Sequence, residues 1–286
     1  MSRIAYVNGR YVPHRDASVH IEDRGYQFAD GIYEVCEVHK GLLVDETRHL
    51  ARMKRSLDEL RIALPMPMSA LRVVLRETIR RNHVREGMVY LQVTRGVARR
   101  DHVFPAAAVR PALVVTARSN DRDKANAAAA AGISVITTPD NRWDRVDIKT
   151  VGLLPNCMAR QAAKEVGAKE AWFVDENGFV TEGAATNAWI VTKDGKLVTR
   201  PAEYGILRGV TRTTLFDIAK AEGLVIEERA FTVAEAKAAR EAFISAATTL
   251  IMPVVKIDHD WVADGKPGAL SLRLRAGFHQ FAEMVA

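Results

Sequence analysis

Val146-Asp-Ile-Lys-Thr150 and Val180-Thr-Glu-Gly-Ala-Ala-Thr-Asn187 are the two stretches that decide how this sequence is understood. They contain Lys149 and Glu182. A lysine that can lose its proton bonds covalently to an aldehyde cofactor, and a carboxylate keeps a neighbouring pyridine nitrogen protonated. Each residue alone is ordinary, because most lysines are solvated and a glutamate before glycine commonly belongs to a turn. The pair therefore indicates chemistry only in combination with further motifs.

The composition is that of an ordinary globular protein. The chain has 286 residues, of which 48% are hydrophobic and 27% charged, enough for one large domain or two domains. No apolar run is long enough to span a bilayer, and the first ten residues lack the apolar core of a signal peptide. The two cysteines, Cys36 and Cys157, stand in unrelated contexts. We expect reduced thiols in a cytoplasmic protein, with neither a disulfide nor a metal site.

The charge permits anionic ligands without favouring nucleic acid. The net charge is +6, but acidic residues nearly match the basic ones in number. The pairs Arg80-Arg81 and Arg99-Arg100 are short and have no interleaved aromatic residues on which bases could stack. A nucleic-acid role is therefore a weak alternative, and phosphorylated or carboxylated small molecules fit the charge equally well.

The expected elements mix strands and helices without regular alternation. Asn8-Gly9 predicts a hairpin between residues 4–7 and 10–12, and Lys40-Gly41 predicts a turn after a strand over 31–38. Thr47 is a candidate N-cap of a helix with an apolar face at 50, 53, 57 and 60. Further strands are expected at 88–95, 112–117, 132–138, 171–174, 187–192, 196–199, 224–228, 242–245 and 254–257, and further helices at 69–82, at 156–166, at 211–223, from 270, and in the Ala-rich stretch before Gly132.

This order of elements predicts an α+β fold rather than a doubly wound sheet. The charged segment 118–126 begins without an apolar period and is the predicted linker. It separates a small N-terminal domain over residues 1–117 from a larger C-terminal domain over 127–286.

Motifs spread over nearly the whole chain carry a family resemblance. With these motifs in the family's order along the sequence, the chain resembles the class IV, fold-type IV pyridoxal-phosphate aminotransferases. Among them, it resembles the D-amino acid aminotransferases most closely. The matching segments are 22–35, 91–105, Asp147-Ile-Lys149, Val180-Thr-Glu-Gly183, 206–212 and Ile251-Met-Pro253. The family's fold implies a small α/β domain followed by a larger cofactor-binding domain with a mixed sheet or barrel.

The resemblance also implies residue roles. Lys149 matches the Schiff-base lysine of pyridoxal 5′-phosphate, and Glu182 matches the partner of the pyridine nitrogen. Arg52 matches the family's phosphate-binding arginine, and Leu207 matches the residue that packs against the cofactor ring. Without the resemblance, Arg52 would be a solvated helix residue and Leu207 plain core.

The cofactor phosphate needs several donors, preferably at a helix N-terminus. Val210 and Thr211 stand where a helix is expected to begin, although Thr211 alone would be an ordinary helix cap. The family's second hydroxyl cluster differs here, because Ala247 replaces a usual threonine and Leu250 a common glutamate. We expect either Thr248 or a backbone N–H to take that place. Likewise, residues 183–186 replace a serine-rich run, which implies fewer hydroxyl contacts to the cofactor.

The loop 96–105 concerns the substrate. A carboxylate is best held by a planar guanidinium with a second donor beside it, and Arg100 and His102 stand two residues apart in an extended loop. Charge alone would make this a solvated basic turn. In the D-amino acid enzymes, this Arg-x-His spacing and a tyrosine that matches Tyr33 form the trap for the substrate carboxylate. The family contributes the loop from a neighbouring subunit, so the resemblance implies a homodimer with shared active sites.

The expected function is a transaminase that moves an amino group between D-amino acids such as D-alanine and 2-oxo acids such as 2-oxoglutarate. An L-branched-chain aminotransferase and an aminodeoxychorismate lyase are the alternatives, since both share the lysine and the glutamate. A ligand-binding homologue without turnover is disfavoured by the intact Lys149 and Glu182.

Overall fold

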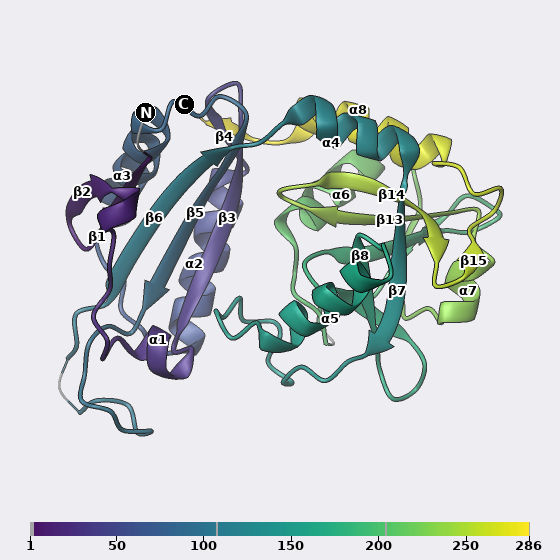
Figure 1. Ribbon diagram of the computed structural model, residues 1–286. Coiled ribbons are helices and arrows are strands. Elements are labelled where there is room, and N and C mark those ends of the chain that lie inside the picture. The colour runs from purple at the N-terminus through teal and green to yellow at the C-terminus, as the bar shows by residue number, and fades with distance from the viewer. Residues whose placement is uncertain (1–2, 107, 204, 286) are drawn as a thin grey trace. The chain divides into compact units, whose positions relative to one another are not determined.

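The computed structural model describes residues 3–106, 108–203 and 205–285 of the chain. The chain forms two compact units, which are described separately (Figure 1). The first combines the described residues of Met1–Asp121 with Ile148–Gly152 and Glu283–Ala286, and the second comprises Arg122–Asp147 and Leu153–Ala282. Within the described part of the chain, no helix has both the length and the apolar character needed to cross a bilayer.

The first unit is built on a seven-stranded antiparallel sheet with the strand order β16-β4-β3-β5-β6-β1-β2. Its strands are β1 (Ile4–Val7), β2 (Arg10–Pro13), β3 (Gly31–His39), β4 (Leu42–Val44), β5 (Gly87–Thr94), β6 (Ala112–Ser119) and β16 (Met284–Val285). Its helices are α1 (Arg24–Phe28), α2 (Glu46–Glu59) and α3 (Met68–Arg81), with a 3-10 turn, η1, at His14–Asp16.

Both predicted hairpin turns of this unit are confirmed. Asn8 and Gly9 join β1 to β2 with φ angles of 47° and 100°, and Lys40 and Gly41 join β3 to β4 with φ angles of 54° and 83°. Two successive left-handed residues match the twist of the flanking strands, which is why such residue types favour tight hairpins.

Helices α2 and α3 pack against this sheet and form the core of the unit with it (Figure 1). The predicted apolar face of α2 is confirmed at Leu50, Met53 and Leu57, which are buried. The prediction that Thr47 caps α2 is wrong. Asp45 precedes the helix, and Thr47 lies in its first turn, where its hydroxyl donates to Glu283 Oε1 at 2.7 Å. A partner 236 residues away in sequence leaves no local signal.

Strand β3 presents different chemistry on its two faces. Successive side chains of a strand point to opposite sides. Ile32, Glu34 and Cys36 are buried on one face, whereas Tyr33 and Val35 are half-buried on the other. The side chains of Tyr33 and Glu34 therefore lie on opposite faces of the sheet although the residues are neighbours in sequence.

The segment that contains Lys149 pairs with the part of β3 that β4 does not cover. Strand β4 pairs with β3 only at Val38 and His39, near the end of β3. At the start of β3, Thr150 forms an antiparallel bridge with Ile32, and the N–H of Tyr33 donates to the carbonyl oxygen of Lys149 at 3.0 Å. This pairing places Lys149 beside Tyr33 and explains why residues 148–152 belong to the first unit.

The second unit is built on a nine-stranded mixed sheet, in the order β12-β11-β10-β13-β14-β7-β8-β9 with β15 paired to β14. The strands are β7 (Ile133–Pro139), β8 (Glu170–Val174), β9 (Val180–Gly183), β10 (Asn187–Val191), β11 (Leu197–Thr199), β12 (Ile226–Glu228), β13 (Glu241–Ala246), β14 (Leu250–Ile257) and β15 (Asp260–Trp261). The helices are α4 (Arg122–Ala131), α5 (Leu154–Glu165), α6 (Val210–Ala221), α7 (Val233–Lys237) and α8 (Ala269–Phe281).

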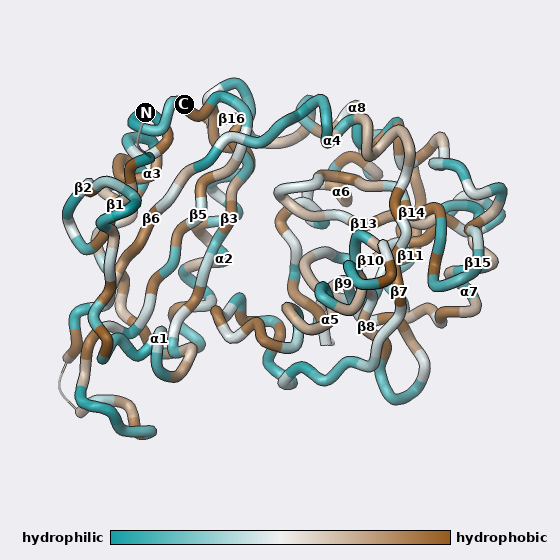
Figure 2. Tube along the Cα trace, in the orientation of Figure 1, coloured by the Kyte–Doolittle hydropathy of each residue, from teal (hydrophilic) through white to brown (hydrophobic). Residues whose placement is uncertain are grey.

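This sheet joins parallel and antiparallel neighbours. The pairs β11-β12, β14-β7 and β7-β8 are parallel, and the other pairs are antiparallel. Hydrophobic residues concentrate in the strands, whereas the connecting loops are largely hydrophilic (Figure 2). Helices and sheets thus mix without regular alternation, which confirms the predicted α+β class.

Several segments differ from the sequence-based expectation at the level of elements, among them the predicted linker and β9. Most of the predicted linker 118–126 is ordered secondary structure, because β6 continues to Ser119 and α4 begins at Arg122. The Ala-rich stretch after it has high helix propensity, which extends the helix upstream. Strand β9 is absent from the predicted elements; its four residues are all buried and therefore show no alternation.

Candidate active site

Lys149 lies against an aromatic surface in the first unit. Its ammonium nitrogen is 4.2 Å from the centre of the Tyr33 ring. The Tyr33 ring stacks in turn on Tyr90, with 5.7 Å between the ring centres. Burial raises the pKa of Tyr90 to about 12, and its hydroxyl donates to Gln92 Oε1 at 2.7 Å. The fold therefore brings two predicted residues, Lys149 and Tyr33, into direct contact.

Arg52 is held by a buried carboxylate from the opposite face of β3. Its Nε and Nη2 donate to the two oxygens of Glu34 at 2.7 and 2.8 Å. His49 Nδ1 lies 2.8 Å from the same carboxylate. Burial alone would raise the pKa of Glu34, but Arg52 and His49 lower it to about 2. Burial lowers the pKa of His49. Arg52 thus has a fixed orientation, which suits a residue that recognises a phosphate.

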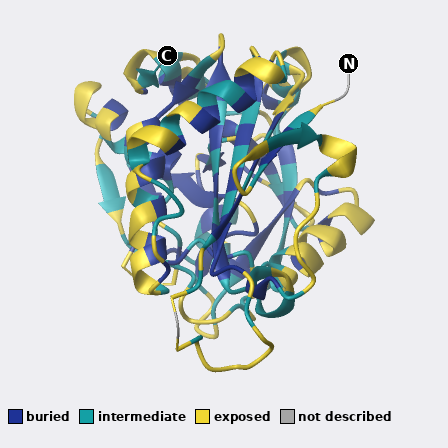
Figure 3. Cartoon of the chain, turned by 90° about the vertical axis from the view of Figure 1, so that its left-hand side faces the viewer, coloured by how far each residue is buried: buried dark blue, intermediate teal, exposed yellow. Residues whose placement is uncertain are grey.

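The loop after β5 is largely exposed (Figure 3, yellow loop at the bottom). Arg100 and His102 are exposed residues of this loop, and both side chains lie beside the ring of Phe28. The Arg100 guanidinium is 4.9 Å from the centre of that ring, and the His102 ring centre is 5.5 Å from it. The two predicted donors therefore share one aromatic neighbour. Among the described residues, no hydrogen bond, ion pair or ring contact joins either of them to Tyr33.

A buried arginine fixes this loop between its two predicted donors. Arg24 in α1 donates from Nη1 to the carbonyl oxygen of Asp101 at 2.6 Å and from Nε to Asp30 Oδ2 at 2.8 Å. Its guanidinium also lies 4.8 Å from the Phe28 ring centre. A charged group held from several sides in the interior is a rigid anchor.

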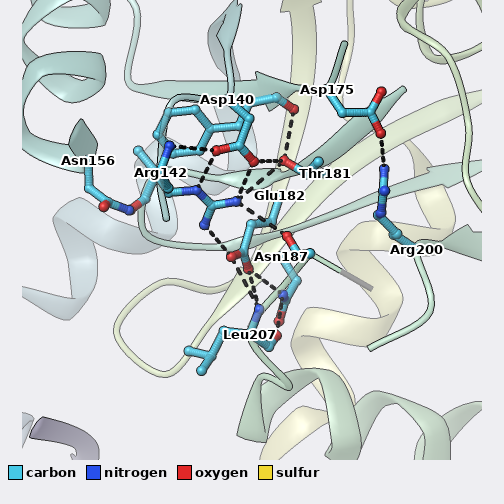
Figure 4. Close-up of polar contacts among 12 residues, drawn as sticks. Asp140, Arg142, Asn156, Asp175, Thr181, Glu182, Asn187, Arg200 and Leu207 are labelled. Carbon is cyan, nitrogen blue, oxygen red and sulfur yellow. Dashed lines mark hydrogen bonds and ion pairs between the residues drawn. The ribbon is translucent and has the colours of Figure 1, made fainter. Parts of the chain in front are cut away.

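In the second unit, Glu182 is a buried carboxylate surrounded by donors (Figure 4). Its Oε1 accepts from Arg142 Nη1 at 2.5 Å, and its Oε2 accepts from Asn187 Nδ2 at 3.0 Å. The backbone N–H of Leu207 lies 3.2 Å from both oxygens. Each of these donors stabilises the ionised carboxylate, which is the form that can hold a cationic ring nitrogen.

Asn187 connects Glu182 to the start of α6. Its amide also donates to the carbonyl oxygen of Leu207 at 2.9 Å. A Cβ on Gly209 would lie 2.0 Å from Asn187 Oδ1, so any other residue here would have to displace the Asn187 side chain. The chain from Leu207 to Gly209 is thereby held close to the carboxylate.

The first turn of α6 is suited to an anion. Helix α6 begins at Val210, and Val210 and Thr211 are buried. The first N–H groups of a helix have no acceptor within it, and the helix dipole favours negative charge there. Thr211 and the backbone N–H groups beside it therefore form a donor set that fits a phosphate.

The β13-β14 turn contributes a second hydroxyl. Thr248 is exposed, whereas the Thr249 hydroxyl is buried and has no hydrogen-bond partner among the described residues. A buried hydroxyl without a partner is costly unless a ligand or water satisfies it. The donor set of this unit thus includes a carboxylate for a cation and N–H and hydroxyl groups for an anion, which fits a phosphorylated pyridine. The described residues contain no group of three or more His, Cys, Asp or Glu able to hold a metal ion.

Several residues around the predicted ones, in one unit or the other, have no place in the sequence-based prediction. They are Arg24, Phe28, Asp140, Arg142 and Asn187. Arg24 and Phe28 stand in the segment 22–35 that carries part of the resemblance, and Arg142 precedes Lys149 by seven residues. Their partners come from other elements, so only the fold reveals their roles.

Comparison with known proteins places this chain in a family. The model of the class IV aminotransferases matches residues 31–257. The chain is 39% identical over 282 residues to a D-alanine aminotransferase of Staphylococcus haemolyticus, covering 97% of both chains. It is also 39% identical over 273 residues to a D-alanine aminotransferase of Listeria innocua, covering 95% of this chain and 93% of the relative.

Solved structures show the same fold. The branched-chain amino acid aminotransferase of Escherichia coli superposes with a TM-score of 0.90 at 22% identity, over 98% of this chain and 94% of that one. A hypothetical aminotransferase from Mycobacterium tuberculosis, solved in its PLP-bound form, gives a TM-score of 0.83 at 22% identity, over 96% of this chain and 97% of that one. These likenesses confirm the predicted fold-type IV architecture, and the family match confirms the predicted resemblance. The chain belongs to the class IV aminotransferase family.

Proposed function

We propose that the protein is a pyridoxal-phosphate-dependent transaminase that exchanges amino groups between D-amino acids, such as D-alanine, and 2-oxo acids, such as 2-oxoglutarate. Family membership supports the transaminase activity, and the similarity to D-alanine aminotransferases over nearly the full chain supports the D-amino acid substrates. The geometric observation that carries the proposal is the buried Glu182 carboxylate with its fixed donors.

Lys149 and Glu182 are the proposed catalytic residues. Bound pyridoxal 5′-phosphate supplies an electron sink for the negative charge that develops on the substrate Cα. Glu182 would hold the ring nitrogen protonated, and Lys149 would hold the cofactor covalently through its side-chain amine. The Lys149 amine, once free, would act as general base and acid and move the proton that leaves the substrate Cα. Contact with the Tyr33 ring limits where its amine can lie.

The other cofactor contacts are proposed from their surroundings. The phosphate is assigned to Arg52 and to the first turn of α6 with Val210 and Thr211, because a fixed guanidinium and a helix N-terminus both bind anions. Thr248 remains a proposed phosphate contact, although the buried Thr249 hydroxyl beside it has the greater need of a partner.

Leu207 is proposed to pack against the cofactor ring. Hydrogen bonds to Glu182 and Asn187 fix its main chain, so its Cα is held next to the Glu182 carboxylate. No metal ion is needed for this chemistry, because the ring and the protein donors supply the charge stabilisation.

Tyr33, Arg100 and His102 are the proposed trap for the substrate carboxylate. A guanidinium with a neighbouring donor grips a carboxylate in one orientation, and that orientation decides which face of Cα meets Lys149. Arg100 and His102 both lie beside the Phe28 ring, and among the described residues no hydrogen bond, ion pair or ring contact joins either of them to Tyr33. We therefore propose a homodimer in which the loop 96–105 of one subunit completes the site of the other.

The compact units are proposed as the small and the large domain of this enzyme. Both cysteines are free, with Cys36 buried and Cys157 exposed, which supports a cytoplasmic protein. An L-branched-chain aminotransferase and an aminodeoxychorismate lyase remain the alternatives with the same cofactor. The likeness to the branched-chain structure, at 22% identity, carries the fold and not the substrate.

A spectroscopic experiment tests the proposal. Protein loaded with pyridoxal 5′-phosphate should show a visible band that D-alanine removes and 2-oxoglutarate restores. Lys149→Ala should lose the covalent band, whereas Lys164→Ala, on an exposed position of α5, should keep it. A band that persists in Lys149→Ala would overturn the lysine assignment. A band that no amino acid alters would favour a ligand-binding protein without turnover.

A further inference from the structure

Arg142 is a buried guanidinium between two carboxylates (Figure 4). Its side chain is 6% exposed. Nε and Nη2 donate to Asp140 Oδ1 and Oδ2 at 2.9 and 2.7 Å, and Nη1 donates to Glu182 Oε1 at 2.5 Å. The guanidinium carbon lies 4.5 Å from the centre of the Phe173 ring. Hydrogen bonds on three nitrogens and a ring on one face leave the guanidinium a single orientation.

Arg142 and Asp140 are both kept in their charged forms. Burial alone would lower the pKa of Arg142, but the bonds to Asp140 and the charge of Glu182 raise it well above its ordinary value. Burial would raise the pKa of Asp140, but Arg142 and the Thr181 hydroxyl, which donates to Asp140 at 2.8 Å, hold it below its ordinary value. The negative charges of Asp140 and Glu182 therefore lie on either side of the positive charge of Arg142.

The second carboxylate has an electrostatic consequence. A carboxylate stabilises a protonated ring nitrogen through its negative charge. A guanidinium bound to Glu182 alone would cancel that charge and favour the neutral ring. Asp140 occupies two of the three guanidinium nitrogens, so one net negative charge remains for the group that faces Glu182.

We infer that Asp140 and Arg142 are positioning residues for Glu182: Arg142 fixes its carboxylate, and Asp140 cancels the positive charge that Arg142 brings. The inference rests on the proposed function, in which Glu182 meets the ring nitrogen of pyridoxal 5′-phosphate. The pair acts through Glu182 and touches neither the substrate nor the reacting atoms.

The test measures the protonation of the ring nitrogen directly, by NMR of the holoenzyme loaded with ring-¹⁵N pyridoxal 5′-phosphate over a range of pH. Asp140→Asn removes the cancelling charge, so the pH at which the ring nitrogen loses its proton should fall by about one unit or more. Arg142→Met removes the cation and should not lower that pH. The double variant Asp140→Asn/Arg142→Met removes both charges and should return towards the wild-type value.

The recovery in the double variant separates charge balance from a merely structural tether, because a tether would be lost in all three variants. Asp175→Asn is the matched control, since Asp175 accepts from Arg200 at 2.7 Å in the same unit but has no contact with Glu182 (Figure 4). It should leave the ring nitrogen unchanged. If Asp140→Asn does not fold, Arg142→Met and the double variant carry the test, and a lowered value in either contradicts the inference.

Different results would overturn the charge-balancing inference and the proposed function. Identical ring-nitrogen signals in wild type and Asp140→Asn up to high pH would overturn the charge-balancing pair while leaving the transaminase proposal intact. Failure of the wild-type protein to bind the cofactor or to transaminate D-alanine would instead overturn the proposed function.

Discussion

The Glu34 carboxylate has no exposed surface, and its charged form is stabilised by Arg52 and His49. Taking charges out of water costs several kcal/mol for each ion, and the ion pair with Arg52 offsets much of that cost. Removal of one partner leaves the other charge buried and unpaired. The same contacts hold the guanidinium that is proposed to bind the phosphate, so stability and cofactor affinity are coupled here.

Glu34→Gln should lower the free energy of unfolding at pH 7 by about 3–5 kcal/mol, because Arg52 loses its counter-charge in the interior. The pKa of Glu34 is lowered to about 2 in the folded protein from an ordinary value of 4.5. The stability due to its charge is therefore full above pH 4.5 and is lost as the pH falls towards 2. The variant should lack this part of the acid dependence. Urea unfolding followed by circular dichroism from about pH 2 to about pH 7 measures both effects.

Glu77→Gln is the control for that experiment. Glu77 pairs with Arg80 and Arg81 on the exposed surface of α3, and hydrogen bonds from both arginines lower its pKa to about 2 as well. Solvent screens exposed pairs, so this variant should unfold almost as the wild type does. Equal losses in the two variants would contradict the role of burial at Glu34.

Arg100→Ala should raise the KM for D-alanine by about tenfold or more, because the proposed trap loses its bidentate donor. Cofactor affinity should change little, since the guanidinium lies against Phe28 in the exposed loop. Steady-state kinetics and cofactor titration separate the two quantities. Arg99→Ala, one residue earlier and equally exposed, should behave as the wild type. An unchanged KM in Arg100→Ala would remove this residue from the trap.

At the scale of residues, the sequence indicates the chemical groups but not their partners. Lys149 and Glu182 are predictable because a family pattern surrounds them. The contact of Lys149 with Tyr33 and the donation from Arg142 to Glu182 depend on pairing between elements far apart in sequence. The expectation that Thr47 caps α2 fails for the same reason, because its partner, Glu283, lies near the other end of the chain.

At the scale of elements, the loop 96–105 depends on α1 for its position. Arg24 donates to the carbonyl oxygen of Asp101, the residue between Arg100 and His102. Asp30 holds Arg24 from the other side. This anchor limits how the two proposed donors move, and a misplacement of about 1 Å costs as much as about a hundredfold in rate.

Arg24→Lys should raise the KM for D-alanine by about tenfold while the protein stays folded. Lysine keeps the charge beside Asp30 but has no second donor arm for the Asp101 carbonyl oxygen. Kinetics together with thermal unfolding measure the two effects. Arg118→Lys, at an exposed position of β6, should alter neither. A large loss of stability without a change in KM would make Arg24 a structural residue only.

Elements with local signals are predictable from the sequence, and those without them are not. The β1-β2 hairpin follows from Asn8-Gly9, and the apolar spacing of α2 follows from its sequence. Strand β9 has no such signal because all four of its residues are buried, and α1 and α7 are too short, at five residues each, to show a helical period. The start of α4 at Arg122 resembles a loop in the sequence because its first turn is charged.

At the scale of the whole molecule, the chain crosses between its units several times. Residues 148–152 and 283–285 belong to the first unit although their neighbours in sequence belong to the second. β16 pairs with β4, and the Lys149 segment pairs with β3. Sequence composition marks a boundary where the chain changes character, so short returning segments of this kind leave no compositional signal.

The proposed homodimer with shared active sites predicts that two impaired variants complement each other. In a homodimer, a mixture of Lys149→Ala and Arg100→Ala subunits forms hybrids in which one of two sites has both residues intact. After random reassociation, about a quarter of all sites should regain wild-type kinetics towards D-alanine. Sites with the wild-type KM should appear only after denaturation and refolding of the mixture, because refolded Arg100→Ala alone keeps its raised KM and refolded Lys149→Ala alone stays inactive. No recovery in hybrids shown to be dimeric would contradict the shared site.

The most direct test of the proposed function compares D-alanine and L-leucine as amino donors to 2-oxoglutarate, with one preparation of the holoenzyme. The ratio of their kcat/KM values reports how the enzyme orients the substrate carboxylate towards Lys149. We predict ready transamination of D-alanine and little or none of L-leucine. Efficient transamination of L-leucine with no turnover of D-alanine would contradict the D-amino acid assignment.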